Sequence, residues 1–383
     1  MSIMLPSLNS AHLSLADVLP SCLASLGILD VPNKLELPEA RAAVVVLVDG
    51  LGAHNLQATA AHARFLKNQN SFHHSITSVF PSTTAAALAS LTTGVSPGLH
   101  GMTGYKVRNP ESGEVVNLLT GLGALPQPEQ WLTSPPLYST ATVNEVSASV
   151  VAHPRFADSS LTKIIHAGSE QVSGKTIEER VVATLSLVQQ PGKHLVVLYV
   201  SELDELAHNK GVMSSEWSAA LESVDGALKI LSDELPADAG VFVTADHGVI
   251  DVPPTRHYLY GNDVEHMQHI ASVGGEPRCL QLYFSEDATA SQREATLLTW
   301  RKDWSELAWV MSREEVINAG LYGQVANTSM QRIGDIFVLA NKDVAFYDER
   351  DLTFKGRNMI GQHGGMSTTE LSIPAIRLGA FAN

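Results

Sequence analysis

The chain has 383 residues and a mass of 41.0 kDa, enough for one large α/β domain or about two average ones. With 44% hydrophobic and 17% charged residues it can bury a large core, which excludes wholesale disorder. The excess of 40 acidic over 25 basic residues gives a formal net charge of −15, which opposes binding to a nucleic-acid polymer. A small anionic substrate remains compatible with this charge, because cations bound in a cleft can reverse the local field.

Cysteine content and the N-terminal sequence bear on the compartment. Cys22 and Cys279 lie far apart, and we expect both to be buried and reduced rather than part of a disulfide framework. No Lys or Arg precedes Lys34, and no apolar run reaches the roughly 18 to 20 residues of a membrane span. We therefore expect a soluble cytoplasmic protein without membrane contact. The sequence carries no signal of oligomeric state.

Short runs of β-branched residues and leucine alternate along the chain with helical patterns. Runs that are apolar throughout are typical of strands buried on both faces of a parallel sheet. This alternation predicts an α/β fold, a three-layer α/β/α sandwich with a mostly parallel central sheet. In chain order the predicted elements are a strand at 43–48, helices at 84–91 and 176–188, a strand at 195–200, a helix at 214–231 and a strand at 241–244.

Two stretches interrupt this rhythm within what we expect to be one domain, residues 1–383. Residues 94–136 are rich in Gly, Pro and Thr, which predicts loops over the carboxyl edge of the sheet, where an active site would lie. Residues 252–359 form the second interruption, which we interpret as a small inserted α+β subdomain. Its predicted elements are a strand at 279–284, a helix at 292–304 and a strand at 335–339.

Aspartates stand at the carboxyl ends of three predicted strands. Asp49 follows the first strand, Asp204 follows the second closely, and Asp246 follows the third. Each of them alone could simply start a turn or cap a helix. Ligands of open α/β sheets gather beyond the carboxyl ends of the strands, so we expect the three carboxylates to converge.

Histidines accompany these aspartates at spacings that suit metal binding. Asp204 and His208 are four residues apart, on one face if the segment is helical. Asp246 is followed directly by His247, and His363 lies in a glycine-rich loop. Carboxylate oxygen and imidazole nitrogen are ligands of zinc, and a catalytic zinc uses about three protein ligands. Six such ligands suit two divalent metal ions. We expect both ions to be zinc, with manganese and iron as alternatives.

A hydroxyl nucleophile is expected in the segment Phe80 to Leu88, where Pro81 precedes two threonines and a helix of small residues. A hydroxyl at a helix N-terminus lies where backbone N–H groups and the helix dipole favour an arriving phosphate and an alkoxide. The alternative is that Thr83 or Thr84 only caps the helix. A threonine alkoxide at neutral pH requires a metal.

The ordered motifs resemble those of the alkaline phosphatase superfamily and, within it, the nucleotide pyrophosphatase/phosphodiesterase family. They extend over most of the chain, and their order is far more specific than any one of them. The matching motifs are Val-Asp-Gly-Leu at 48–51, Phe-Pro-Ser-Thr-Thr at 80–84, Thr-Gly at 93–94, His-Gly at 100–101, Asp-x-x-x-His at 204–208, Asp-His-Gly at 246–248 and His-Gly-Gly at 363–365.

The resemblance implies a role for each matching residue. Thr84 would be the nucleophile that forms a phosphothreonine, with Thr83 as the alternative. Tyr105 stands where the family carries a phosphate-binding asparagine, and a tyrosine hydroxyl could donate the same hydrogen bond with a different reach. One zinc would be held by Asp49, Thr84, Asp246 and His247, and the other by Asp204, His208 and His363.

The function expected from this resemblance is metal-dependent hydrolysis of a small phosphate ester, as a phosphodiesterase or nucleotide pyrophosphatase. A phosphomonoesterase or phosphonate hydrolase of the same superfamily is the alternative, because it would keep the metals and change only the substrate. The alternative that is not an enzyme is a metal-binding scaffold that has lost catalysis.

Overall fold

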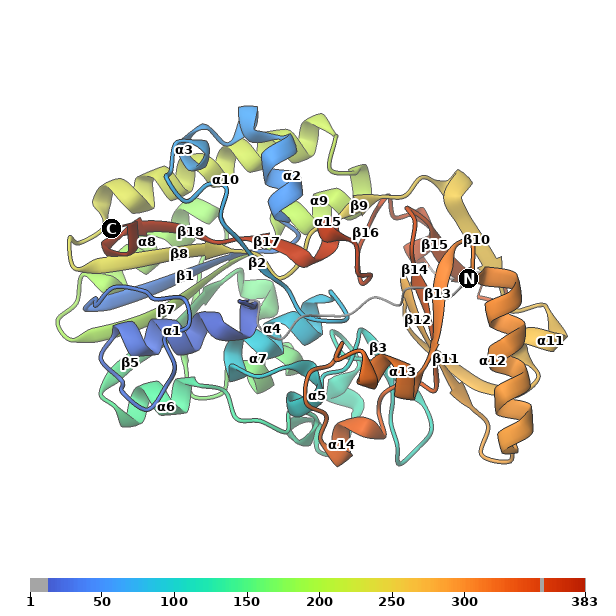
Figure 1. The fold of residues 1–383 in the computed structure, drawn as a ribbon. Coiled ribbons are helices and arrows are strands. Elements are labelled where there is room, and N and C mark those ends of the chain that lie inside the picture. The colour runs from blue at the N-terminus through green and yellow to red at the C-terminus, as the bar shows by residue number, and fades with distance from the viewer. Residues whose placement is uncertain (1–12, 352–354, 383) are drawn as a thin grey trace.

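The computed structural model describes residues 13–351 and 355–382, and its centre is a six-stranded sheet (Figure 1). Five strands are parallel and the edge strand β18 is antiparallel to β8, which confirms the mostly parallel sheet. In spatial order the strands are β18 (Ile376–Gly379), β8 (Ala239–Thr244), β1 (Ala42–Val48), β7 (Lys193–Val200), β5 (Val146–Ala152) and β6 (Glu170–Ser173).

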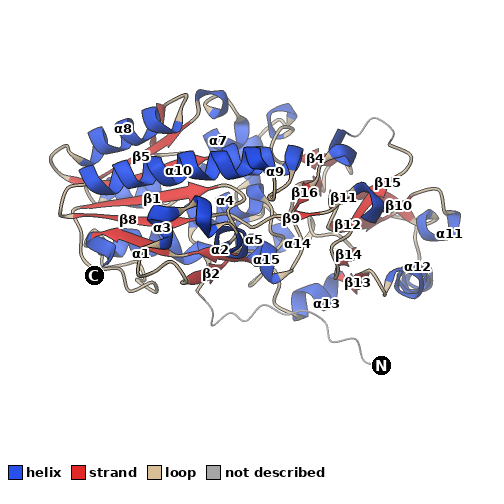
Figure 2. Ribbon diagram, turned by 90° about the horizontal axis from the view of Figure 1, so that it is seen from above, coloured by secondary structure: helices blue, strands red, loops and turns tan. Residues whose placement is uncertain are grey.

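Helices cover both faces of this sheet, which confirms the three-layer sandwich (Figure 1). Figure 2 shows α8 and α10 side by side over one face, and α10 carries an apolar stripe whose residues Trp217, Leu221 and Leu228 are buried. That layer contains α2 (Ala53–Ala58), α3 (Arg64–Lys67), α8 (Ile177–Val188), α9 (Glu202–Lys210) and α10 (Ser215–Glu234). The opposite layer contains α1 (Val18–Ser25), α4 (Thr84–Thr93), α6 (Tyr138–Val143) and α7 (Ser160–Ile165).

Strand register brings the carboxyl ends of the central strands together. All seven residues of β1 are buried, as expected for an apolar strand between two helix layers. Val48 pairs with Val200 of β7, and Leu47 pairs with Thr244 of β8. The residues that follow these three strands therefore begin at the same edge of the sheet.

A second, antiparallel sheet lies beside the first, within residues 252–359 (Figure 1). Its order is β11 (Ile270–Glu276), β12 (Cys279–Phe284), β14 (Ile336–Ala340) and β13 (Ala308–Ser312). One side of this sheet packs on α12 (Ala290–Trp304) around Trp300, and the other side packs around Phe80, which belongs to the segment before α4. The second sheet is thus anchored directly to the segment that leads into Thr84.

The stretch 94–136 holds more regular structure than the predicted loops. It contains α5 (Pro97–His100) and a hairpin of β3 (Lys106–Arg108) and β4 (Val115–Asn117), which contacts β11. Six further strands form three pairs: β2 (Ser75–Thr77) with β17 (Ser372–Pro374), β9 (Ile250–Asp251) with β16 (Gly361–Gln362), and β10 (His257–Tyr260) with β15 (Ala345–Asp348). The other α-helices are α11 (Val264–Met267), α13 (Arg313–Asn318), α14 (Asn327–Met330) and α15 (Thr368–Leu371).

Two further expectations concern the cysteines and membrane contact. Cys22 and Cys279 are both free and buried, as predicted. Burial raises the pKa of the Cys22 thiol to about 12, so this thiol is uncharged at neutral pH. Within residues 13–351 and 355–382, no helix combines the length and the apolar character needed to cross a membrane.

Candidate metal centre and nucleophile

Three aspartates converge at the carboxyl edge of the central sheet. Asp49 directly follows β1, Asp246 follows β8 after one residue, and Asp204 lies in the first turn of α9, just after β7. Gly50 allows this approach: its φ is +73°, and a Cβ atom there would lie 3.0 Å from Asp204 Cβ. The Gly50 N–H also donates to Asp246 Oδ1 at 3.1 Å. A residue with a side chain at position 50 would push these carboxylates apart.

Asp49, Asp246 and His247 form the first of two groups of potential metal ligands. One donor atom of each lies within 4.8 Å of the others, and all three residues are buried. His247 Nε2 is 3.6 Å from Asp49 Oδ1 and 3.3 Å from Asp246 Oδ2. Two oxygens and one nitrogen at this spacing form a set that zinc accepts.

Asp204, His208 and His363 form the second group. Asp204 Oδ2 and His208 Nε2 are 3.2 Å apart, because residues four apart lie on one face of α9. The Nδ1 atoms of His208 and His363 lie 2.8 and 2.9 Å from the carbonyl oxygens of Gly361 and Ser82. This fixes both rings so that Nε2 is the atom left for a ligand bond, an arrangement common around metal-binding histidines.

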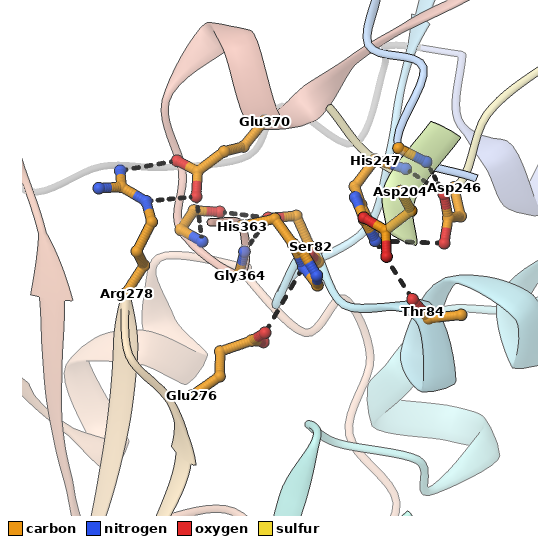
Figure 3. Close-up of polar contacts among 12 residues, drawn as sticks. Ser82, Thr84, Asp204, Asp246, His247, Glu276, Arg278, His363, Gly364 and Glu370 are labelled. Atoms are coloured by element: carbon orange, nitrogen blue, oxygen red, sulfur yellow. Dashed lines mark hydrogen bonds and ion pairs between the residues drawn. The ribbon is translucent and has the colours of Figure 1, made fainter. Parts of the chain in front are cut away.

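The two groups adjoin one another through their histidines. The rings of His247 and His363 are stacked, with centroids 3.7 Å apart and planes at 15°. His208 also lies near His363, at 5.2 Å between centroids. Ligand candidates from four separate parts of the sequence are therefore brought into one largely buried cluster (Figure 3).

Thr84 begins α4, and its hydroxyl faces this cluster (Figure 3). Its Oγ1 lies 3.2 Å from His247 Nε2. The neighbouring Thr83 occupies the N-cap position, but among the described residues its side chain makes no capping hydrogen bond and instead contacts the Glu276 carboxylate. The capping alternative is therefore not what the structure shows, and Thr84 rather than Thr83 lies at the ligand groups.

Charge is strongly concentrated in this cluster. Burial, followed by the nearby Asp246 and Asp204 carboxylates, raises the pKa of Asp49 well above its ordinary value. Burial and Asp204 likewise raise the pKa of Asp246 to about 6. Burial lowers the pKa of His247 to about 4 and, together with the adjacent His247, that of His363 to about 3. His208 is the exception: burial lowers its pKa, but the adjacent Asp204 carboxylate outweighs burial and raises the pKa to about 9, so a cation bound there would displace a proton from His208. Divalent cations bind deprotonated imidazoles and favour the charged form of crowded carboxylates.

The hydrogen bonding of the carboxylates supports a fit to cations. Asp49 Oδ1, Asp204 Oδ1 and Asp246 Oδ2 are buried and have no hydrogen-bond partner within the part of the chain that the structure describes. Buried carboxylate oxygens without a partner are costly, and such atoms in proteins are normally paired or coordinate a metal. The donor set and these unpartnered oxygens therefore suit a pair of divalent cations.

Several residues that shape the cluster were not predicted from the sequence. The Tyr199 hydroxyl donates to Asp49 Oδ2, and the sequence signal for it is a tyrosine within the apolar run that ends β7. Glu276 comes from β11, and its Oε2 lies 3.5 Å from His363 Nδ1. No local sequence signal marks Glu276, because its approach depends on how the second sheet packs against the first.

A buried polar network fixes the loop that carries His363 (Figure 3). The Ser82 hydroxyl donates to the Gly365 carbonyl at 2.9 Å and accepts from the Gly364 N–H at 3.1 Å. Arg278 and Glu370 form a bidentate ion pair, with Nε–Oε1 and Nη2–Oε2 distances of 2.6 and 2.9 Å. Arg278 lies in the turn between β11 and β12 of the second sheet, and Glu370 lies in α15, just after the His363 loop. The pair therefore links the second sheet to this loop.

Comparison with known proteins agrees with the motifs. A family model described as type I phosphodiesterase / nucleotide pyrophosphatase matches residues 43–366. The chain belongs to this family. The resemblance drawn from the motifs is therefore confirmed, and the matched range includes both ligand groups and Thr84.

Sequence matches to curated relatives cover about half of this chain. Ectonucleotide pyrophosphatase/phosphodiesterase family member 1 of rat is 28% identical over 207 residues, which are 51% of this chain and 22% of the relative. The human protein of the same name is 26% identical over 206 residues, with the same two coverages. The match therefore spans only about a fifth of the length of these relatives.

Solved structures with this fold include a murine and a human protein. Murine ectonucleotide pyrophosphatase/phosphodiesterase 5 superimposes with a TM-score of 0.66 at 19% identity, covering 86% of each chain. The human counterpart gives a TM-score of 0.67 at 16% identity, covering 88% of this chain and 87% of that one. An inactive threonine-to-alanine variant of the murine protein has been solved in complex with AMP. These likenesses show that the fold is shared.

Tyr105 does not line the cavity that contains Thr84. Together with Glu276 it lines a cavity of about 170 Å³, whereas Thr84 lines a different cavity of about 420 Å³. The Tyr105 hydroxyl accepts a hydrogen bond from Asn117 Nδ2 at 2.8 Å, and burial raises its pKa. The structure does not bring Tyr105 onto the cavity wall that carries Thr84, so its role in substrate binding stays a prediction.

Proposed function

We propose that this family member hydrolyses small phosphate diesters through a phosphothreonine formed on Thr84. The observation that carries the proposal is the position of the Thr84 hydroxyl, 3.2 Å from His247 Nε2 at the start of a ten-residue helix. The names of the relatives and the AMP complex of the murine neighbour support a phosphate ester as the substrate.

The two ligand groups would hold two divalent cations, for which we propose zinc. Asp49, Asp246 and His247 would bind one ion together with the Thr84 oxygen. The second ion would be held by Asp204, His208 and His363. Bound cations of this kind stabilise negative charge on phosphoryl oxygens and make a hydroxyl nucleophilic at neutral pH.

The chain itself positions the nucleophile and the phosphate. The free N–H groups in the first turn of α4 point toward an anion that lies at Thr84. The Thr84 oxygen attacks phosphorus, the new O–P bond forms, and the leaving alcohol departs with a proton. The phosphoryl group on Thr84 keeps the second substituent of the diester. Water then cleaves the Thr84 O–P bond, a phosphate monoester with that substituent leaves, and the Thr84 hydroxyl is restored. Two in-line displacements give retention of configuration at phosphorus.

The test is hydrolysis of bis(p-nitrophenyl) phosphate by the metal-loaded protein, compared with p-nitrophenyl phosphate. Thr84→Ala should lower kcat by about a thousandfold or more while metal content stays close to that of the parent. Thr83→Ala should retain most activity. The exposed Thr142 on α6 provides a matched control, because Thr142→Ala should leave the rate unchanged.

Three results would count against the proposal. Full activity of the Thr84→Ala protein would move the nucleophile elsewhere. A faster rate on the monoester would indicate a phosphomonoesterase. A metal-loaded protein that is inert on both esters and on a phosphonate ester would indicate a scaffold without catalysis. His363→Ala, measured by elemental analysis, should lose about one metal per chain if the assignment of two ions is right.

A further inference from the structure

A cavity lined by Thr84 lies between the central sheet and helices α4 and α7. Its volume is about 420 Å³, within the usual range of small-ligand pockets. Asp49, Thr84 and Asp204 line one end. Leu88 lies one helical turn after Thr84 and also lines the cavity, so the wall becomes apolar immediately beyond the nucleophile.

Most of the surface that the rest of the wall presents to the cavity is apolar, although polar side chains also line it. The wall is built from strands β1, β5 and β7, from helices α4 and α7, and from the segment after β4. The apolar side chains on it, besides Leu88, are Leu47, Leu91, Leu119, Val150, Ala152, Leu161, Ile165 and Val197.

Most polar side chains on this wall are already engaged by the protein. The Ser159 hydroxyl caps α7 by accepting from the Thr162 N–H at 3.1 Å. His166 Nδ1 lies 3.0 Å from the Tyr138 hydroxyl, and burial lowers the pKa of His166 to about 4, so the ring is uncharged at neutral pH. A ligand in this part of the cavity therefore meets few groups that seek a hydrogen bond.

Arg155 at the rim is also held by the protein. Its guanidinium donates to Ser201 Oγ at 2.7 Å and to Glu205 Oε2 at 2.9 Å, and it lies over the ring of Phe156 at 4.6 Å. Its charge is thus partly neutralised by Glu205 before any substrate arrives.

The two aromatic rings on the wall contact one another. Phe156 and Tyr199 meet edge to face, with centroids 5.5 Å apart and planes at 66°. The Tyr199 hydroxyl is bonded to Asp49. A planar base could not lie between these two rings without separating them, and the hydrogen-bonding edges of such a base would face aliphatic side chains, which costs free energy.

We propose that this cavity binds an apolar alkyl substituent of the phosphate ester in preference to a nucleoside. This rests on the proposed function, because the ester phosphate must lie at Thr84 for its substituent to enter the cavity. An alkyl chain needs no hydrogen-bond partners, and its burial against the aliphatic wall is favourable by the hydrophobic effect. The substrate class is then a phosphodiester that carries an alkyl group.

The experiment is calorimetric binding of methyl, butyl and octyl phosphate, and of AMP, to the metal-loaded protein. Alkyl phosphates below their micelle-forming concentrations are used because they carry one substituent and are not turned over by a diesterase. The dissociation constant should fall about three- to fourfold for each added methylene until the cavity is filled. Octyl phosphate should bind more tightly than AMP.

Leu88→Asn tests the cavity wall directly. In the parent protein, the dissociation constant of methyl phosphate divided by that of octyl phosphate should be large. Leu88→Asn should reduce this ratio by about tenfold or more, because a polar amide replaces apolar surface one turn from Thr84. Leu298→Asn is the control: Leu298 is 55% exposed on α12, and this change should leave the ratio as it is. If the Leu88 variant does not fold, the chain-length series on the unaltered protein still decides the question.

The outcomes separate this inference from the proposed function. Dissociation constants that do not depend on chain length, or tighter binding of AMP than of octyl phosphate, would overturn the inference even if bis(p-nitrophenyl) phosphate is hydrolysed. A protein that binds alkyl phosphates with the expected chain-length dependence but does not hydrolyse the diester would support the apolar cavity and overturn the proposed function.

Discussion

Gly50→Ala should separate the two ligand groups while leaving every ligand in the sequence. Gly50 adopts a φ of +73°, and a Cβ atom there would lie 3.0 Å from Asp204 Cβ and Oδ1 and 3.1 Å from Asp204 Cα. Contacts of this length to a backbone atom cannot be relieved by rotating a side chain alone. We expect α9 to shift, which would carry Asp204 away from Asp49 and Asp246.

The magnitude has two parts. A left-handed backbone conformation costs a residue with a Cβ atom about 1–2 kcal/mol of stability. The contact with Asp204 adds to this and should weaken metal binding by about 10- to 100-fold, the effect typical of disturbing the residues that orient ligands. Gly113 separates the two parts: its φ is +74°, and no heavy atom of the described residues lies within 4 Å of a Cβ placed there.

The assay is urea denaturation of both metal-free variants, followed by zinc titration against a competing chelator. Both variants should lose similar stability from the backbone term, but only Gly50→Ala should lose zinc affinity. Equal zinc affinity in the two variants would refute the argument that Gly50 is required for the approach of Asp204.

Three further predictions concern the network around the ligands. Glu276→Ala should lower zinc affinity by about tenfold or more in a chelator competition assay, because His363 would be held less firmly. Glu276→Gln should bind zinc almost as tightly as the parent, and equal affinities in all three proteins would contradict this role. Arg278→Met should cost about 3–5 kcal/mol in urea denaturation because it leaves Glu370 buried without its cation, whereas Lys229→Met, which breaks an exposed pair, should cost less than about 1 kcal/mol. Dialysis against a chelator should abolish diesterase activity and zinc should restore it; activity that survives complete metal removal would contradict metal dependence.

Much of the site could be predicted from sequence because its residues follow local rules. Asp49 and Asp246 stand directly after buried strands, and the spacing of Asp204 and His208 places them on one face of a helix. Parallel strands end at a common edge, so the convergence of their carboxyl ends follows from the topology itself. The helix that begins at Thr84 could likewise be anticipated from Pro81 and the small residues after it.

Other features depended on contacts between distant segments, which no local pattern encodes. Glu276 reaches His363 only because the second sheet packs against the segment of Phe80. Tyr105 and Glu276 line one cavity and Thr84 lines another, a division that depends on the packing of the second sheet and that counting residues along the chain does not reveal.

The sequence by itself determined the strand-ending carboxylates, the paired histidines and the threonine at a helix start, since each depends on neighbours within a few residues. The tertiary structure decided which of two threonines faces the ligand groups and which side chains line the cavity beside Thr84. The physical reason is that side-chain direction and cavity shape depend on the packing of the helix layers and the second sheet, which bring together residues far apart in the chain.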